Sequence, residues 1–205
     1  MKFKKSIKIE GKLKVLTGLH IGGIKEAFKI GGLDNPFIKI KKVGEAEEPY
    51  IPGSSLKGKI RCLLELEEGK EELCSCGNCM ICKLFGPHKS EKKEPSRVIF
   101  RDAYLEENCR GKEILEIKPE NIIHRCKGTA EHPRFIERVV PGTVFKVEIL
   151  LNVFEDDNEK EMLEKLKHGF ELLQENYLGG SGTRGYGKVD VNEIIENIKK
   201  IQSMC

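Results

Sequence analysis

The order in which two kinds of apolar periodicity follow one another constrains this chain most. Between Val144 and Phe154 every second residue is apolar, the pattern of a β-strand with one buried face. Leu163, Leu166 and Phe170 instead recur at the spacing of a helix. Together with glycine-rich breaks, these patterns predict strand, helix, strand, strand, helix and strand at residues 6–15, 56–69, 98–105, 144–154, 158–177 and 187–191, and a helical tail after them.

This order is that of a split βαβ motif, so the sequence predicts an α+β fold with a ferredoxin-like, RRM-like (βαββαβ) core. With 205 residues, the chain is expected to form a single domain over residues 1–205, with insertions at 69–96 and 113–142. Ser54 or Ser55 is the predicted N-cap of the first helix, and Gly11 a possible bulge in the first strand. Since this architecture hosts many unrelated functions, we look for function in the insertions and loops.

Charge and hydropathy exclude some classes of protein. No run of about 18 apolar residues is present, and residues 1–8 lack the apolar core of a signal peptide, so we expect a cytoplasmic protein. The formal net charge is only +3, with both signs mixed along the chain. Any surface that binds nucleic acid must therefore be a local basic one.

Four of the eight cysteines lie within nine residues, at Cys74, Cys76, Cys79 and Cys82. In a chain without an export signal, such a cluster indicates a metal site more than a disulfide framework. Four thiolates at this spacing suit a structural Zn²⁺ ion; an iron–sulfur cluster or a loop without metal are the alternatives. His88, six residues after the last cysteine of the group, is a possible replacement ligand.

Two further segments have the chemistry to hold phosphates. The segment 179–188 is rich in glycine, which lets main-chain N–H groups approach an anion, and it carries Arg184 and Lys188. In the first helix, Lys57 and Arg61 lie one turn apart, near Ser54 and the helix N-terminus. The alternatives are an ordinary turn before an edge strand and an ordinary solvated helix face.

Asp34 and His20 are the candidates for chemistry. Asp34 lies in a loop of Gly, Asn and Pro, where a carboxylate can bind a hydrated divalent ion or help to activate a ribose 2′-hydroxyl. Taken alone, an Asp in such a loop is more often a turn residue, and a histidine placed like His20 is more often a hydrogen-bonded structural one.

In combination, these motifs are much more specific. Residues 17–23, 50–61, 79–86 and 179–187 (TGLHIGG, YIPGSSLKGKIR, CMICKLFG and GGSGTRGYG) resemble the glycine-bearing loop, the first-helix signature, the metal-binding insertion and the glycine-rich loop of the RAMP superfamily of CRISPR proteins. Within that superfamily the chain is most similar to the repeated backbone subunit of the type III-A (Csm) complex. The resemblance runs from about Leu13 to Val191.

The resemblance implies a function and a set of roles. Residues 113–142 resemble the family's thumb, which reaches across the guide–target duplex; Arg125 and Arg134 lie in it. Asp34 matches the aspartate assigned to target RNA cleavage with Mg²⁺ or another divalent ion, and His20 matches a histidine associated with RNA binding. The remaining RNA-binding candidates are Ser54, Lys57, Arg61, Arg184 and Lys188. His124 departs from the Asp that many relatives have before the thumb's arginine.

The implied partners are CRISPR RNA, target RNA, other Csm subunits and further copies of the chain in a helical filament. The implied activity is that of a metal-dependent endoribonuclease within the guide-loaded complex. Three alternatives stay open: a non-catalytic scaffold that holds RNA, the equivalent subunit of a Cmr-type (III-B) complex, and a RAMP endonuclease that trims precursor CRISPR RNA. The cysteine cluster and the thumb argue against the last.

Overall fold

The computed structural model describes residues 2–23, 34–44, 46–88 and 94–204. Its main sheet is antiparallel in the order β4 (Val98–Phe100), β8 (Val144–Phe154), β1 (Phe3–Val15) and β9 (Val189–Asp190), with β5 (Tyr104–Leu105) also paired to β8. The α+β prediction is therefore confirmed. Part of the loop that precedes Asp34, residues 24–33, and part of the predicted cysteine-rich insertion, residues 89–93, lie outside the described residues.

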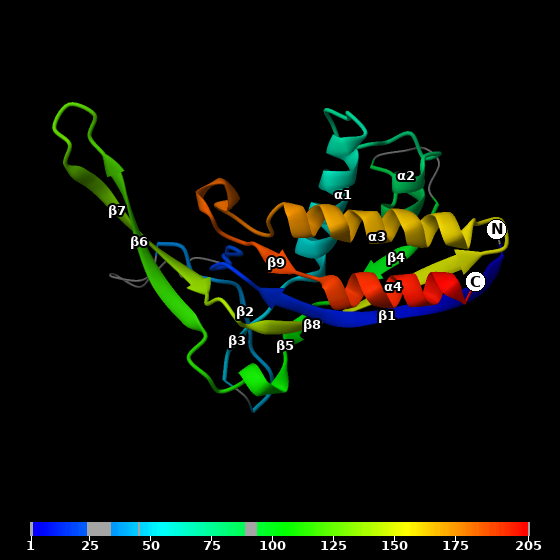
Figure 1. Cartoon of the computed structure of the whole chain (residues 1–205), viewed down its shortest axis with the longest axis horizontal. Coiled ribbons are helices and arrows are strands. Elements are labelled where there is room, and N and C mark those ends of the chain that lie inside the picture. The colour runs from blue at the N-terminus through cyan, green and yellow to red at the C-terminus, as the bar shows by residue number, and fades with distance from the viewer. Residues whose placement is uncertain (1, 24–33, 45, 89–93, 205) are drawn as a thin grey trace.

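One face of the sheet forms the core. Because side chains alternate along a strand, Ile9, Leu13 and Val147 point to the same side and are almost fully buried. Helices α1 (Gly53–Glu67), α3 (Glu159–Glu175) and α4 (Asn192–Ser203) pack there, with α3 and α4 side by side along β1 (Figure 1). The predicted helical tail, now α4, is confirmed.

Two local predictions were wrong. The N-cap of α1 is Pro52, without a side-chain cap, and Asp102 Oδ1 accepts the Gly53 N–H at 2.8 Å from another part of the chain. Gly11 pairs regularly with Val147, and no bulge forms there. Packing explains the glycine at position 11: a Cβ there would lie 2.6 Å from Ile194 Cγ1, so glycine lets α4 approach the strand.

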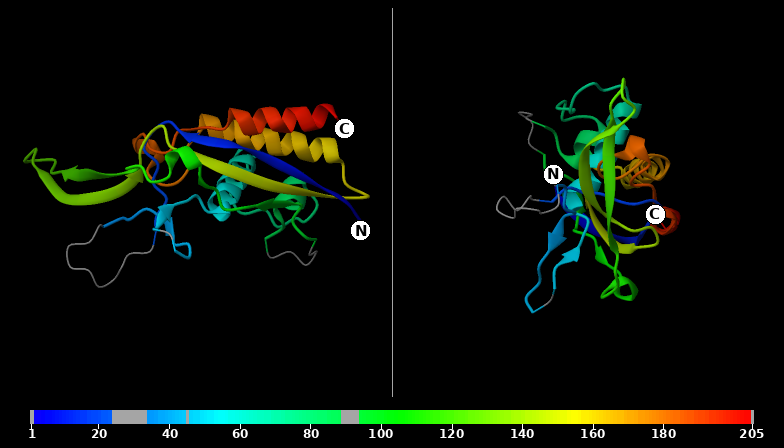
Figure 2. Two further views of the ribbon diagram at one scale, coloured as in Figure 1. Left: turned by 90° about the horizontal axis from the view of Figure 1, so that it is seen from below. Right: turned by 90° about the vertical axis from the view of Figure 1, so that its left-hand side faces the viewer.

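The second predicted insertion, residues 113–142, contains a long hairpin. β6 (Leu115–Ile123) and β7 (Ala130–Val139) pair antiparallel and project from the body, as two views show (Figures 1 and 2). We call residues 115–139 the thumb hairpin. Short elements complete the fold: β2 (Lys39–Ile40), β3 (Glu48–Pro49), α2 (Met80–Phe85), and the 3₁₀ turns η1 (Glu107–Cys109) and η2 (Gly182–Arg184). None of the described helices is long and apolar enough to cross a membrane.

Candidate functional site

The glycine-rich loop, residues 179–188, packs directly on the segment that carries His20. Gly180 N donates to His20 O at 2.9 Å, and Gly187 N donates to Gly18 O at 3.0 Å. A Cβ on Gly179, whose φ is +77°, would lie 2.2 Å from His20 O, so only glycine allows this approach. The structure thus brings together two motifs that are about 160 residues apart in sequence.

His20 is held by the root of the thumb hairpin. Its Nδ1 lies 2.7 Å from the main-chain oxygen of Glu137, and its ring is half-buried. The Glu137 carboxylate, itself buried, accepts from Phe37 N and from Lys39 Nζ, both at 2.8 Å. One strand of the thumb therefore fixes both the His20 loop and the segment after Asp34.

Asp34 lies at the outer edge of β7. Its Oδ2 accepts the Phe135 N–H at 3.0 Å, and the next residue, Asn35, forms a parallel bridge with Ile136. The carboxyl group is exposed, and within the described part of the chain no hydrogen-bond partner of its Oδ1 occurs. An exposed carboxylate with one oxygen fixed and one open can bind a hydrated cation.

The charged residues predicted on α1 are less exposed than expected. Lys57 is half-buried and donates to Ser96 Oγ at 3.1 Å; burial, followed by the charge of Arg61, lowers its pKa. Ser54 is exposed in the first turn of α1, and the Asp102 carboxylate occupies the position beside the Gly53 N–H where a phosphate was expected. The helix end therefore has a protein carboxylate where the sequence predicted a phosphate.

Arg61 contacts the cysteine-rich segment at both ends. Its Nη2 donates to Cys74 O at 2.9 Å and its Nη1 to Gly86 O at 2.8 Å, while its Nε donates to Glu65 at 2.9 Å. Glu65 Oε1 also accepts the Cys74 N–H at 3.0 Å. All three donor groups of Arg61 are thus used inside the protein, which is the pattern of a structural residue.

The remaining basic candidates are at the surface. Arg125 lies at the tip of the thumb hairpin and Arg134 midway along β7, both exposed. Lys188 is exposed, and its main-chain N–H donates to Thr17 Oγ1 at 3.0 Å. Arg184 is 58% exposed and forms an ion pair of 2.9 Å with Glu120 of β6. The thumb and the glycine-rich loop thus carry the exposed cations of the site.

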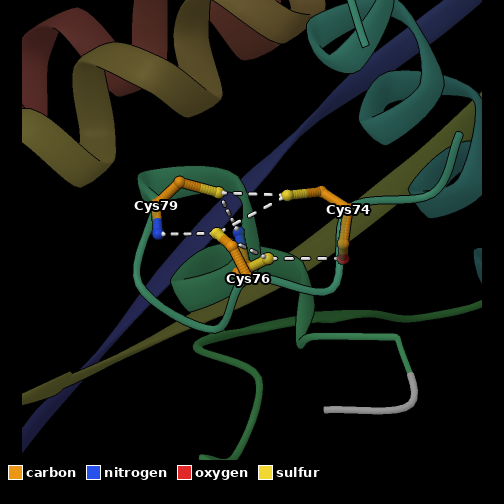
Figure 3. A group of neighbouring side chains, drawn as sticks. Cys74, Cys76 and Cys79 are labelled. Atoms are coloured by element: carbon orange, nitrogen blue, oxygen red, sulfur yellow. Dashed lines mark hydrogen bonds between the residues drawn. The ribbon is translucent and has the colours of Figure 1, made fainter. Parts of the chain in front are cut away.

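Cys74, Cys76 and Cys79 come together at the start of α2 (Figure 3), and Cys82, in the first turn of α2, completes the group of four. Their Sγ atoms all lie within 4.8 Å of one another, and three of the pairs are 3.6, 3.7 and 3.9 Å apart. A tetrahedral ion with metal–sulfur bonds of about 2.3 Å requires sulfur atoms about 3.8 Å apart, so the residues fit a single zinc-sized ion. His88 is exposed and outside this group, so its role as a replacement ligand has no support among the described residues.

The surroundings of Cys76 and Cys82 change the pKa of their thiols. The N–H groups of Asn78 and Cys79 lower the pKa of Cys76 to about 6, and burial raises the pKa of Cys82 to about 12. Lys70 Nζ lies 3.5 Å from Cys79 Sγ, a position in which it stabilises thiolate charge. A cation is the group that brings all four sulfurs to the thiolate form together.

Comparison with known proteins decides the family. The model of the RAMP superfamily matches residues 12–190. The CRISPR system Cms endoribonuclease Csm3 of Methanocaldococcus jannaschii is 49% identical in an alignment of 204 positions that covers 93% of this chain and 80% of the relative. The chain belongs to the Csm3 family of the RAMP superfamily.

Other relatives agree with this assignment. Csm3 of Streptococcus thermophilus is 40% identical over 195 residues, covering 89% of this chain and 86% of the relative. A chain in the crystal structure of a Csm3–Csm4 subcomplex of the type III-A CRISPR-Cas interference complex is 32% identical, with a TM-score of 0.63 and coverage of 100% and 98%. The predicted Csm membership is confirmed over the Cmr alternative, since the relatives named here are Csm3 proteins.

Sequence reasoning missed three side chains of this Csm3-family site. Glu137 was noted only as part of the thumb, and Glu120 and Tyr186 were not assigned roles. A signal existed for Glu137, since a carboxylate beside Ile136 and Val139 in a strand is often buried and paired. No local pattern indicated the contact between Glu120 and Tyr186, because they are 66 positions apart.

Proposed function

We propose that the chain is a guide-RNA-binding backbone subunit of a type III-A CRISPR interference complex, and that within the guide-loaded complex it cleaves RNA complementary to the guide. The relatives' name, endoribonuclease Csm3, supports the activity. The observation that carries the proposal is the placement of Asp34, an exposed carboxylate bonded to the main chain of the thumb hairpin at Phe135. Other Csm subunits and further copies of the chain, stacked along the guide, complete the complex.

Asp34 is the proposed catalytic residue. Its open oxygen suits Mg²⁺, which keeps most of its waters and needs one or two carboxylates; when bound, the ion would neutralise charge on the scissile phosphate. In the reaction, a ribose 2′-oxygen loses its proton and bonds to the adjacent phosphorus, and the bond to the 5′-oxygen breaks. That oxygen takes up a proton, giving a 2′,3′-cyclic phosphate and a 5′-hydroxyl. The Phe135 N–H fixes the carboxylate at the hairpin edge, which orients it before the target arrives.

The RNA-binding residues fall into two groups in this proposal. Exposed side chains contact the backbone of guide or target: Ser54, Arg125, Arg134, Arg184 and Lys188, with Lys57 at the margin of α1. His20 and Arg61 act by shaping the surface, since both have protein partners. Phosphate contacts of this kind position the RNA, while base pairing with the guide selects the sequence.

Two finer parts of the proposal concern the scaffold. The core is ferredoxin-like, which is supported by the antiparallel order β4-β8-β1-β9 and by α1 and α3 as its two crossover helices. The ion at the cysteine cluster is Zn²⁺ in a structural role, supported by four thiol ligands and sulfur separations that suit one tetrahedral ion. We expect the complex to act in the cytoplasm, where guide and target RNA are available.

The test compares guide-loaded complexes made with native chain, Asp34→Asn and Asp156→Asn. Asn at position 34 keeps an oxygen that can accept the Phe135 N–H but loses the charge. Asp156, exposed in the turn between β8 and α3, is the matched control. With complementary RNA and Mg²⁺, we expect regularly spaced cuts from the native and control complexes and a loss of at least a hundredfold in rate for Asp34→Asn, with target binding retained.

Other outcomes assign other functions. Equal cutting by all three complexes, or by none, would leave Asp34 without a catalytic role and favour a scaffold that holds RNA. Products with a 3′-hydroxyl and a 5′-phosphate would rule out attack by the 2′-oxygen. Cleavage of repeat RNA by the chain alone would instead indicate processing of precursor CRISPR RNA.

A further inference from the structure

Tyr186 and Glu120 join the glycine-rich loop to the thumb hairpin, and neither has a part in the chemistry described above. Tyr186 is 1% exposed although it lies in a loop whose neighbours Arg184 and Lys188 are exposed. Its hydroxyl donates to Glu120 Oε1 at 2.8 Å. The other oxygen of the same carboxylate, Oε2, accepts from Arg184 Nη1 at 2.9 Å. Glu120 thus connects to two residues of the loop at once.

The ring of Tyr186 is held as firmly as its hydroxyl. Lys118 Nζ lies 4.5 Å from the ring centroid and the guanidinium carbon of Arg138 4.9 Å from it. Lys118 comes from β6 and Arg138 from β7, so the ring is in contact with both strands of the hairpin. Cation–π contacts of this kind add to the attraction when they are shielded from water.

The position of this cluster on the hairpin is informative. Along one edge, β7 hydrogen-bonds to β6, and along the other it bonds to Asp34 and Asn35. Glu120 is the partner of Arg134 in the ladder, one residue from Phe135, whose N–H is bonded to Asp34. At the position of Glu120 and Arg134, the hairpin therefore has contacts on both strands: β7 bonds to the Asp34 segment, and β6 bonds to the glycine-rich loop.

β6 has particular need of such a contact. Among the described residues β6 forms a ladder only with β7, and this two-stranded hairpin projects from the body (Figure 1). A two-stranded ribbon alone is only marginally stable and twists easily. Side-chain contacts from the middle of β6 to the glycine-rich loop therefore restrain the direction in which the hairpin points.

We propose that Glu120 and Tyr186 form a latch that holds the thumb hairpin in register with Asp34, and that both are positioning residues for RNA cleavage. This inference rests on the proposed function, since the latch serves a reaction at Asp34. The latch acts through geometry: an error of about 1 Å in the placement of reacting groups can cost about a hundredfold in rate. Neither residue needs to contact RNA.

The variants separate geometry from charge. Tyr186→Phe removes the hydroxyl and keeps the ring between its cations. Glu120→Gln keeps an oxygen that can accept from Tyr186 but loses the ion pair with Arg184, and Glu120→Leu loses both. Tyr177→Phe is the matched control, because its hydroxyl has no hydrogen-bond partner among the described residues, although Lys59 Nζ lies over its ring at 3.8 Å.

The first readout is single-turnover cleavage by guide-loaded complexes at saturating target, with cut positions mapped and target affinity measured in parallel. We expect Tyr186→Phe and Glu120→Leu to cut at least threefold more slowly and at less uniform positions, with affinity within twofold of native. Tyr177→Phe should cut as the native complex does, and Glu120→Gln, which keeps the acceptor for the Tyr186 hydroxyl, should be impaired less than Glu120→Leu. Native rates and positions in Tyr186→Phe, or a loss of affinity equal to the loss of rate, would overturn the positioning role.

The second readout tests the latch without cleavage. Hydrogen exchange of the β6–β7 ladder, measured on the full chain, should be at least threefold faster in Tyr186→Phe than in Tyr177→Phe. Equal exchange in the two variants overturns the latch whether or not the complex cuts RNA. Faster exchange in Tyr186→Phe, together with a native complex that leaves target intact, would retain the contact as a structural one and overturn its role in cleavage along with the proposed function.

Discussion

Two glycines in the same loop, Gly185 and Gly187, give a matched test of how the glycine-rich loop is built. Both have positive φ, +86° and +74°. A Cβ on Gly185 would meet nothing within 4 Å, whereas a Cβ on Gly187 would lie 2.0 Å from the carbonyl oxygen of Leu178. Replacing each with alanine therefore imposes a similar backbone strain, but only Gly187→Ala adds a collision with main chain.

The magnitudes follow from these contacts. Alanine in the left-handed region costs about 1 kcal/mol, part of which is offset because alanine also restricts the unfolded chain. At position 187 the clash cannot be relieved by a side-chain rotation, since the obstructing atoms belong to the main chain of Leu178. Relief requires the loop to shift, which disrupts the bonds from Gly187 N to Gly18 O and from Leu178 N to Gly187 O. At about 1 kcal/mol for each bond, Gly187→Ala should be about 2 kcal/mol less stable than Gly185→Ala.

Urea unfolding followed by circular dichroism measures this difference. With a slope of about 2.5 kcal/mol per molar urea, the midpoint of Gly187→Ala should lie about 0.8 M below that of Gly185→Ala. Guide RNA affinity should fall in the same order, because the loop carries Arg184 and Lys188. Equal midpoints, at equal slopes, would refute the argument that close packing on Leu178 requires glycine at position 187.

Three further predictions concern other parts of the chain. Cys76→Ser should lower bound zinc from one equivalent and lower the melting temperature, with elemental analysis as the measurement; neither zinc nor iron in folded native protein would contradict the metal site. Burial acts to raise the pKa of Asp157, but hydrogen bonds from Arg97 and from Phe154 N outweigh it and hold the pKa low. The Asp157 carboxylate therefore contributes stability above its unfolded pKa, and this contribution is lost as the pH falls through the folded pKa. Asp157→Asn breaks its ion pair with Arg97, in which both side chains are 3% exposed, and should lower the free energy of unfolding by about 3 kcal/mol at pH 7. It should also flatten the acid limb of a curve of stability against pH. Lys188→Ala should weaken guide RNA binding equally across sequences and reduce the salt slope by about 0.7, and an unchanged slope would mean that Lys188 faces solvent in the complex.

The elements themselves were predictable from local patterns. The alternation from Val144 to Phe154 is that of the observed β8, and the helical spacing before Gly69 is that of α1. Asn158, the first residue of the predicted helix 158–177, is the N-cap of α3, and its Oδ1 accepts the Glu161 N–H at 3.3 Å. These features depend on residues within a few positions of one another, so periodicity and cap chemistry were enough to predict them.

The error in the predicted N-cap of α1 arose where a distant residue competes with local ones. Ser54 and Ser55 are good N-caps by type, but Asp102 reaches the first N–H of α1 from across the fold. The guanidinium of Arg61, predicted to contact phosphate, instead donates to the main-chain oxygens of Gly86 and Cys74 in the structure. A side chain's preference is a local property, whereas the partner that it meets depends on the packing of other segments.

The sequence by itself determined the α+β order of elements, the cysteine cluster with metal-ligand spacing, and the family, because each depends on residue types at short or fixed separations. Only the tertiary structure decided which of these features meet: Asp34 with Phe135 of the thumb hairpin, the glycine-rich loop with His20, and Tyr186 with Glu120. These contacts join residues from 66 to about 160 positions apart. The Tyr186–Glu120 bond and the main-chain bonds of the glycine-rich loop give partners to polar groups that packing removes from water, whereas the Asp34–Phe135 bond lies at the surface. No local pattern specifies that partner; the packing of the folded chain does.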